Sequence, residues 1–212
     1  MTVQVKICGL NAPDAIAAAS RADFAGFVFY PPSPRAVLPA QAAKLASRLP
    51  RRVKRVALLV DPDDAALRAV FIAFRPDMVQ LHGKEPPERV AEIRKAFSVE
   101  VMKALAIGTA ADLDAARAFD GAADWLLFDA KPPKRPDALP GGNATSFDWT
   151  LLAGRSWHKP WMLSGGLTPE NVGEALRIAR APAVDVSSGV EDRPGHKDPA
   201  RIAAFLAAAR GG

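Results

Sequence analysis

The chain has 212 residues, of which 49% are apolar and 24% charged, a composition typical of globular proteins and too apolar for a disordered segment. A single cysteine excludes disulfides within the chain and a zinc site made of clustered cysteines. The 28 Lys and Arg outnumber the 23 Asp and Glu, and the net charge of +5 is compatible with nucleic acid or with a small anionic substrate.

Other features narrow the class of protein. The densest basic run, residues 51–55, contains no aromatic side chain, so we interpret it as a solvated loop and expect no nucleic-acid partner. His82, His158 and His196 are scattered, and we expect no metal. The start of the chain lacks the apolar core of a signal peptide, and no apolar run approaches the roughly 20 residues of a membrane helix. We therefore expect no membrane partner and a cytoplasmic location.

Short β-branched segments alternate with alanine-rich segments of helical period along the whole chain. The intervals between the segments leave room for a return helix after each strand. Prolines mark several expected helix starts, in residues 11–14, 168–170 and 198–200. Eight candidate strands begin near Val3, Phe24, Lys54, Asp77, Val99, Asp124, Pro160 and Ala183.

Eight strand–helix units of this size predict an α/β fold, a single-domain (β/α)8 TIM barrel that spans residues 1–212. A doubly wound open sheet is the alternative, although no GxGxxG motif follows the first strand. The longest expected loop, residues 131–146, is rich in proline and glycine. Loops of this length in compact domains are usually functional lids or disordered segments.

Polar residues share one face of the first strand. Gln4, Lys6 and Cys8 alternate with apolar positions, so in a barrel they point inward, with Cys8 at the carboxyl end. A free cysteine is commonly a small buried apolar residue. A neighbouring ammonium favours the thiolate, however, and Gly9 permits close approach of the backbone. Both interpretations of Cys8 stay open on this evidence.

Two further strands end in residues that can carry or accept protons. Asp129 closes the sixth strand after an apolar run, where a carboxylate must be paired, solvated or functional. A cap on the following turn is the alternative role. Gln80 and His82 share one face of the fourth strand, where a lone histidine is more often structural than catalytic.

The last two strands run into turns of small residues. Gly165 and Gly166 follow Ser164 in one turn, and Ser187, Ser188 and Gly189 form the other. Such turns let backbone N–H groups converge on an anion, and many barrels bind phosphate after strands 7 and 8. Tight turns without a ligand are the alternative. With a thiol and a carboxylate at other strand ends, the pattern predicts proton transfer on a phosphorylated substrate.

The order of the motifs makes the chain similar to a known family. It resembles the phosphoribosylanthranilate isomerases of tryptophan biosynthesis over nearly its whole length. The segments that carry the resemblance are residues 6–9 (KICG), 26–29 (GFVF), 33–35 (SPR), 80–83 (QLHG), 127–129 (LFD), 147–149 (FDW), 164–167 (SGGL), 169–172 (PENV) and 185–191 (DVSSGVE). Where the family usually has Gly-Gly-Thr-Gly, this chain has residues 141–144 (GGNA).

The resemblance implies a cofactor-free barrel that converts N-(5-phosphoribosyl)anthranilate to 1-(2-carboxyphenylamino)-1-deoxyribulose 5-phosphate. It implies that Cys8 is the general base and Asp129 the general acid. Arg35 would bind the anthranilate carboxylate, and His82 and Asp185 would lie near the substrate. The phosphate would bind at the turns after the seventh and eighth strands.

Two other functions are compatible with such a barrel. The histidine-pathway isomerase performs the same chemistry, but its barrels repeat the phosphate turn in both halves, and the first half here has no Gly-Gly counterpart. A non-catalytic basic barrel would need neither the thiol nor the carboxylate. The expected partner is the phosphorylated small molecule alone, and the chain is expected to be a monomer or a homodimer.

Overall fold

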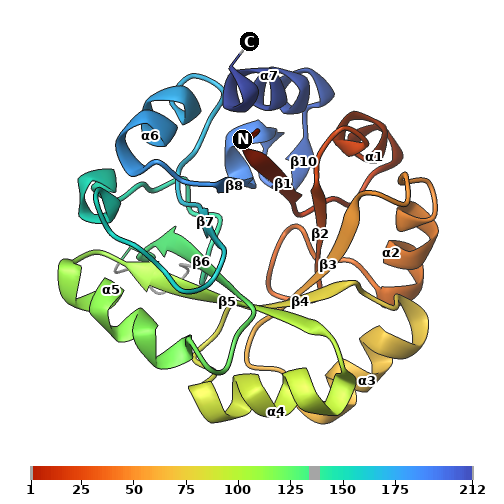
Figure 1. Ribbon diagram of the computed structural model, residues 1–212. Helices are drawn as coiled ribbons and strands as arrows, with labels where there is room; N and C mark the ends of the chain where they lie inside the picture. Colours follow the sequence, from red (N-terminus) through yellow and green to blue (C-terminus); the bar gives the residue numbers. More distant parts are fainter. Residues whose placement is uncertain (1, 134–138, 212) are drawn as a thin grey trace.

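The computed structural model describes residues 2–133 and 139–211. Eight parallel strands form a closed barrel in chain order, with the helices in a ring around it (Figure 1). The pairing of β1 with β8, which places Lys6 opposite Asp185, closes the barrel and excludes the open doubly wound sheet. The strands are β1 Gln4–Cys8, β2 Phe24–Val28, β3 Lys54–Leu59, β4 Met78–Leu81, β5 Glu100–Ile107, β6 Trp125–Ala130, β7 Trp161–Leu163 and β8 Ala183–Val186.

Prolines begin several of the surrounding helices, as the sequence predicts. In α7 the Asp198 side chain also accepts hydrogen bonds from the N–H groups of Ala200 and Arg201, which no helical carbonyl could satisfy. The helices are α1 Pro13–Ala19, α2 Pro39–Ala46, α3 Asp64–Ala73, α4 Pro87–Phe97, α5 Ala110–Ala115, α6 Val172–Ala179 and α7 Pro199–Arg210, with 3-10 turns η1 Ala116–Phe119, η2 Trp149–Leu152 and η3 Ser188–Val190.

The helix start expected at residues 168–170, after β7, is wrong by a few residues. The Thr168-Pro169 pair lies in a turn in which the Asn171 side chain accepts a hydrogen bond from the Thr168 N–H and donates one to the Gly166 carbonyl. Because the Asn171 side chain closes this turn, the regular helix α6 begins only at Val172.

The sixth strand–helix unit also differs from the expectation. Between β6 and β7 the described residues contain the 3-10 turn η2 and no α-helix. Proline lacks an N–H group, and the Pro- and Gly-rich loop takes most of the interval between the two strands. Residues 134–138 of the predicted loop at 131–146 lie outside the described part of the chain.

Side-chain alternation divides the barrel into two kinds of core. Outward residues such as Val5 and Ile7 pack against the helices, as predicted. Toward the amino ends of the strands the interior is apolar, whereas Lys6, Gln80 and Asp185 form a buried polar layer nearer the carboxyl ends. The interior apolar residues are Phe24, Val56, Met78, Met102, Ala104, Leu127, Met162 and Ala183.

Two short strands, β9 Glu191–Arg193 and β10 His196–Lys197, form an antiparallel hairpin after β8. Within the described residues, no helix has the length and apolar character needed to cross a bilayer.

Candidate active site

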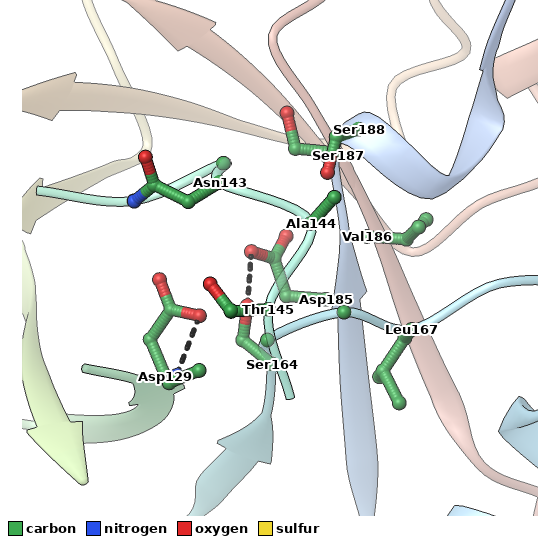
Figure 2. A pocket seen from close by; sticks show the side chains of 15 residues that line it. Asp129, Asn143, Ala144, Thr145, Ser164, Leu167, Asp185, Val186, Ser187 and Ser188 are labelled. Atoms are coloured by element: carbon green, nitrogen blue, oxygen red, sulfur yellow. Dashed lines mark hydrogen bonds between the residues drawn. The ribbon is translucent and has the colours of Figure 1, made fainter. Parts of the chain in front are cut away.

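The predicted site residues converge at the carboxyl ends of the strands. Cys8, Arg35, His82 and Asp129 line one cavity, together with Asp185 and Ser187. An adjoining cavity shares Asp129 and Asp185 and is also lined by Gly165, Gly166 and Ser188 (Figure 2). The two cavities thus connect the thiol, the carboxylates and the small-residue turns.

Cys8 and Lys6 point inward from β1 and meet over Gly26 of β2. A Cβ on Gly26 would lie 2.9 Å from the Cys8 Sγ and 3.2 Å from the Lys6 Nζ, so only glycine leaves this space. Lys6 Nζ also donates to Asp185 Oδ1 at 2.9 Å, and Ser164 Oγ donates to the second oxygen of Asp185 at 3.4 Å. The carboxylate of Asp185 is therefore held between an ammonium and a hydroxyl.

Burial decides the charge of the thiol. Cys8 is 3% exposed, and this burial raises its pKa above the ordinary value although the Lys6 ammonium opposes the shift. Burial alone would lower the pKa of Lys6, but the Asp185 carboxylate and the Cys8 side chain raise it. The sequence suggested that Lys6 would favour the thiolate; the cation is in place, yet the net shift has the opposite direction.

Asp129 is held by a chain of hydrogen bonds. Its Oδ1 accepts from the Ala130 N–H at 2.9 Å, and its Oδ2 lies 3.2 Å from Nε2 of His82. The other ring nitrogen of His82, Nδ1, is 2.9 Å from Nε2 of Gln80. Gln80 of β4 and His82, directly after that strand, point to the same side, as predicted, and connect to the carboxylate on β6, two strands away in the barrel.

Arg35 lies in the loop after β2 and is buried against two glycines. A Cβ on Gly9 would be 2.7 Å from the Arg35 Cδ, and one on Gly142 would be 2.7 Å from Nη1. The guanidinium donates from Nε to Glu191 Oε1 at 2.7 Å and from Nη2 to Oε2 at 2.8 Å. The Nε and Nη2 edge of the guanidinium is therefore paired with the Glu191 carboxylate.

Glu191 also binds Lys197 of β10. Its Oε1 accepts from Lys197 Nζ at 2.6 Å, and the same ammonium donates to the Ser187 carbonyl at 3.0 Å. Although burial favours the neutral acid, hydrogen bonds from Arg35 and Lys197 hold the pKa of Glu191 below its ordinary value. Burial lowers the pKa of Lys197 to about 8, against the attraction of Glu191.

The turns after β7 and β8 leave a small-residue surface beside Asp129. Gly165 and Gly166 have φ values of 90° and 63°, a conformation that favours glycine. A Cβ on Gly166 would lie 2.8 Å from the Ser146 N, so the loop after β6 packs directly on this turn. Ala144 lines the same cavity with a φ of 55°, where the family pattern has glycine.

One predicted phosphate residue lies outside the two cavities. Gly189 does not line either of them, and its Cα packs against the Leu167 carbonyl, where a Cβ would collide. Conversely, Glu191 and Lys197 belong to the network around Arg35 although neither was a predicted site residue. Glu191 lay within a recognised motif, and its position just after the predicted phosphate turn was the only signal.

The described part of the chain contains no group of three or more His, Cys, Asp or Glu side chains that could hold a metal ion. What the site offers is a thiol and a carboxylate at separate strand ends, a partly occupied guanidinium and a turn of small residues. This set can move two protons on a substrate that carries two anionic groups.

Known proteins share this architecture and sequence. Residues 5–208 match the family described as N-(5'phosphoribosyl)anthranilate (PRA) isomerase. An N-(5'-phosphoribosyl)anthranilate isomerase of Rhodospirillum centenum is 61% identical over 211 residues, with 99% of each chain covered. The isomerase structure from Thermotoga maritima has a TM-score of 0.87 and 37% identity, covering 99% of this chain and 100% of that one.

A second solved isomerase, with a TM-score of 0.82 and 35% identity over 99% of this chain and 100% of its own, is in complex with reduced 1-(o-carboxyphenylamino)-1-deoxyribulose 5-phosphate. These similarities extend over the whole barrel and agree with the motifs at the strand ends. The chain belongs to the N-(5'-phosphoribosyl)anthranilate isomerase family.

Proposed function

We propose that this isomerase of tryptophan biosynthesis uses Cys8 as its general base and Asp129 as its general acid. The reaction is the Amadori rearrangement of N-(5-phosphoribosyl)anthranilate to 1-(2-carboxyphenylamino)-1-deoxyribulose 5-phosphate. The observation that carries the assignment is that a thiol from β1 and a carboxylate from β6 line one cavity. That cavity continues into the glycine turn after β7.

The chemistry requires one acid and one base. Asp129 gives its proton to the ring oxygen as the C1–O bond breaks, which leaves a protonated imine between C1 and nitrogen. The imine acidifies the C2 hydrogen, which the Cys8 thiolate removes, and an enolamine forms. Ketone formation adds one proton at C1 and releases one from the C2 hydroxyl, so both residues can return to their starting states.

The raised pKa of Cys8 bears on this role. A thiol that is neutral at rest must release its proton to solvent before it can act as a base, and the Lys6 ammonium, which opposes the effect of burial on the thiol pKa, lies beside the resulting thiolate. Lys6 therefore stabilises the thiolate by Coulomb attraction within the buried site. Its partner Asp185, which lines both cavities, is proposed to contact the substrate together with His82.

Arg35 is proposed to bind the anthranilate carboxylate with the part of its guanidinium that Glu191 leaves available. Nη1 forms that part, because Nη2 donates to Glu191 and, at 3.4 Å, to the Gly142 carbonyl. The phosphate is proposed to bind at Gly165, Gly166, Ser187 and Ser188. Gly189 serves this site through packing, because it lets the two turns approach each other.

Substitution of the two proton-transferring residues tests the assignment. Cys8→Ala and Asp129→Asn should each lower kcat by on the order of 10² to 10⁴ while the circular dichroism spectrum is kept. The assay mixes protein with freshly generated phosphoribosylanthranilate and follows the loss of anthranilate fluorescence. Near-normal turnover in either variant would show that the residue has a different role.

The proposal also places the enzyme in the cytoplasm, as a monomer or homodimer that works without a cofactor. Support for activity without a cofactor comes from the chemistry, since both proton transfers can be performed by Cys8 and Asp129. Sedimentation equilibrium of the purified chain distinguishes monomer from homodimer, and extensive dialysis against a chelator should leave turnover unchanged.

A further inference from the structure

Gln80 is a fully buried polar residue whose neighbours on the adjoining strands are apolar. It is 0% exposed, and its register partners on the neighbouring strands are Leu58 and Met102. Its Nε2 contacts Nδ1 of His82, whereas its Oε1 has no hydrogen-bond partner among the described residues. A buried acceptor without a partner costs about 1 to 3 kcal/mol. Packing alone would favour an apolar side chain here, so the amide needs another explanation.

The contact with His82 supplies one, because a neutral imidazole carries one N–H and one lone pair. When the Gln80 amide donates to Nδ1, the hydrogen must be on Nε2, which then donates to the ionised carboxylate of Asp129. When the amide turns by 180°, its oxygen accepts from a hydrogen on Nδ1. Nε2 then accepts from a protonated Asp129.

The two arrangements are closely matched in the bonds that they make. Each has one hydrogen bond between Gln80 and His82 and one between His82 and Asp129, and each leaves one end of the amide unpaired. They differ by one proton on Asp129. The amide is the side chain suited to both arrangements, because it presents a donor and an acceptor on the same carbon.

We propose that Gln80 is a positioning residue whose amide orientation selects the tautomer of His82 and thereby the protonation state of Asp129. This inference rests on the proposed role of Asp129 as the acid. The arrangement with Oε1 toward Nδ1 is the form ready to protonate the ring oxygen. The arrangement with Nε2 toward Nδ1 stabilises the carboxylate that remains after this proton has left.

The other titratable groups around His82 lie on neighbouring loops and strands. The ones that line the cavities shared with His82 are Cys8, Tyr30, Arg35, Asp61, Lys84 and Asp185. None of them contacts its ring nitrogens within the described residues, where Gln80 and Asp129 are the only hydrogen-bond partners of the ring. The tautomer of His82 is therefore governed by these two side chains.

Nuclear magnetic resonance of the full chain labelled with ¹⁵N-histidine tests the proposal directly. Long-range ¹⁵N–¹H spectra show which ring nitrogen of His82 carries the proton, and a His82→Asn sample identifies its signals among the three histidines. A parallel ¹³C spectrum follows the Asp129 carboxyl. We expect the hydrogen to move from Nδ1 to Nε2 as Asp129 loses its proton. A His82 that keeps one tautomer throughout the Asp129 titration overturns the proposal.

Two substitutions extend the test to catalysis. Gln80→Met fits the apolar neighbours, removes both the donor and the acceptor, and should lower kcat by roughly 10- to 100-fold with KM nearly unchanged. Gln80→Glu can only accept when its carboxyl is ionised, and in that form it should keep the hydrogen on Nδ1 and move the pH profile of kcat to higher pH. Met102→Leu, at the register partner of Gln80 on β5, is the packing control and should retain both kcat and its pH profile.

The outcomes separate this proposal from the one on which it rests. Normal turnover in Asp129→Asn would remove the proposed acid and with it the need for a tautomer switch. An inactive Asp129→Asn variant together with unchanged His82 tautomers and an unchanged pH profile in Gln80→Met would refute the role of Gln80 alone. A loss of kcat in Gln80→Met that Met102→Leu reproduces would show that packing is responsible.

Discussion

Replacement of Glu191 by glutamine should destabilise the folded protein by about 4 kcal/mol at pH 6 and by about 1.5 kcal/mol at pH 9. Glu191 is the buried counter-ion of two cations, Arg35 and Lys197, and both donate to the same oxygen, at 2.7 and 2.6 Å. Glutamine keeps the shape and one acceptor but loses the charge. Arg35 is then buried without a counter-ion, and Lys197 loses the partner that favours its charged form.

The pH-dependent part comes from Lys197, whose pKa is about 8 beside Glu191. Loss of an attraction of about 4 kcal/mol, the value for unit charges 4 Å apart at an effective dielectric constant of 20, would lower that pKa by about three units. At pH 6 the wild type then keeps a charged Lys197 that the variant cannot keep. At pH 6, two units below its pKa of about 8, protonation of Lys197 stabilises the folded wild type by about 2.7 kcal/mol.

The direction of this effect follows from proton binding. In the variant the folded state releases the Lys197 proton at about pH 5, far below the ordinary lysine value of about 10.4, so its stability relative to the wild type rises between about pH 5 and 8. Above pH 8 the wild-type Lys197 is also neutral. The remaining loss of about 1.5 kcal/mol reflects the weaker hydrogen bonding of Arg35 to a neutral amide.

Urea unfolding followed by circular dichroism at pH 6 and pH 9 measures both values. Asp192→Asn is the control, because Asp192 forms an exposed pair with His196 in the same hairpin and should change stability by less than about 1 kcal/mol. A Glu191→Gln/Lys197→Met double variant should lose the pH dependence. Equal destabilisation by Glu191→Gln at both pH values would refute the reasoning about Lys197.

The barrel could be predicted from the sequence because its signals are local. Alternation in β1 placed Lys6 and Cys8 inward, and the same period brought Asp129 to the carboxyl end of β6. The start of α6 was less predictable, since a proline is compatible with a helix start and with a turn. The side chain of Asn171, which decides between them, acts through contacts that propensities do not describe.

The network around Arg35 depends on contacts between distant parts of the chain. Arg35 and Glu191 are 156 residues apart, and their pairing follows from barrel closure and from the β9–β10 hairpin. The direction of the pKa shift of Cys8 also could not be predicted from the sequence. A sequence shows that Lys6 is two positions away, but it does not show how much solvent is removed from the thiol, and burial has the larger effect on its pKa.

Further predictions concern the anion sites and the thiol. Arg35→Lys should weaken binding by about 1 to 3 kcal/mol for substrate that carries the carboxylate and hardly at all for an analogue without it; equal losses for both compounds would exclude Arg35 as the carboxylate ligand. Gly166→Asp should raise KM, because a side chain at a φ of 63° would enter the turn and a carboxylate would repel the phosphate of the substrate. In the wild type, millimolar inorganic phosphate should compete with the substrate. An unchanged KM in the variant would place the phosphate elsewhere. Lys6→Met should move the pH midpoint for alkylation of Cys8 by iodoacetamide upward, because the ammonium is the main group that opposes the effect of burial on the thiol pKa. Asp185→Asn should move the midpoint downward, because this carboxylate raises the same pKa. The two shifts must differ in sign, and an identical midpoint in both variants would show that the Lys6–Asp185 pair does not control ionisation of the thiol.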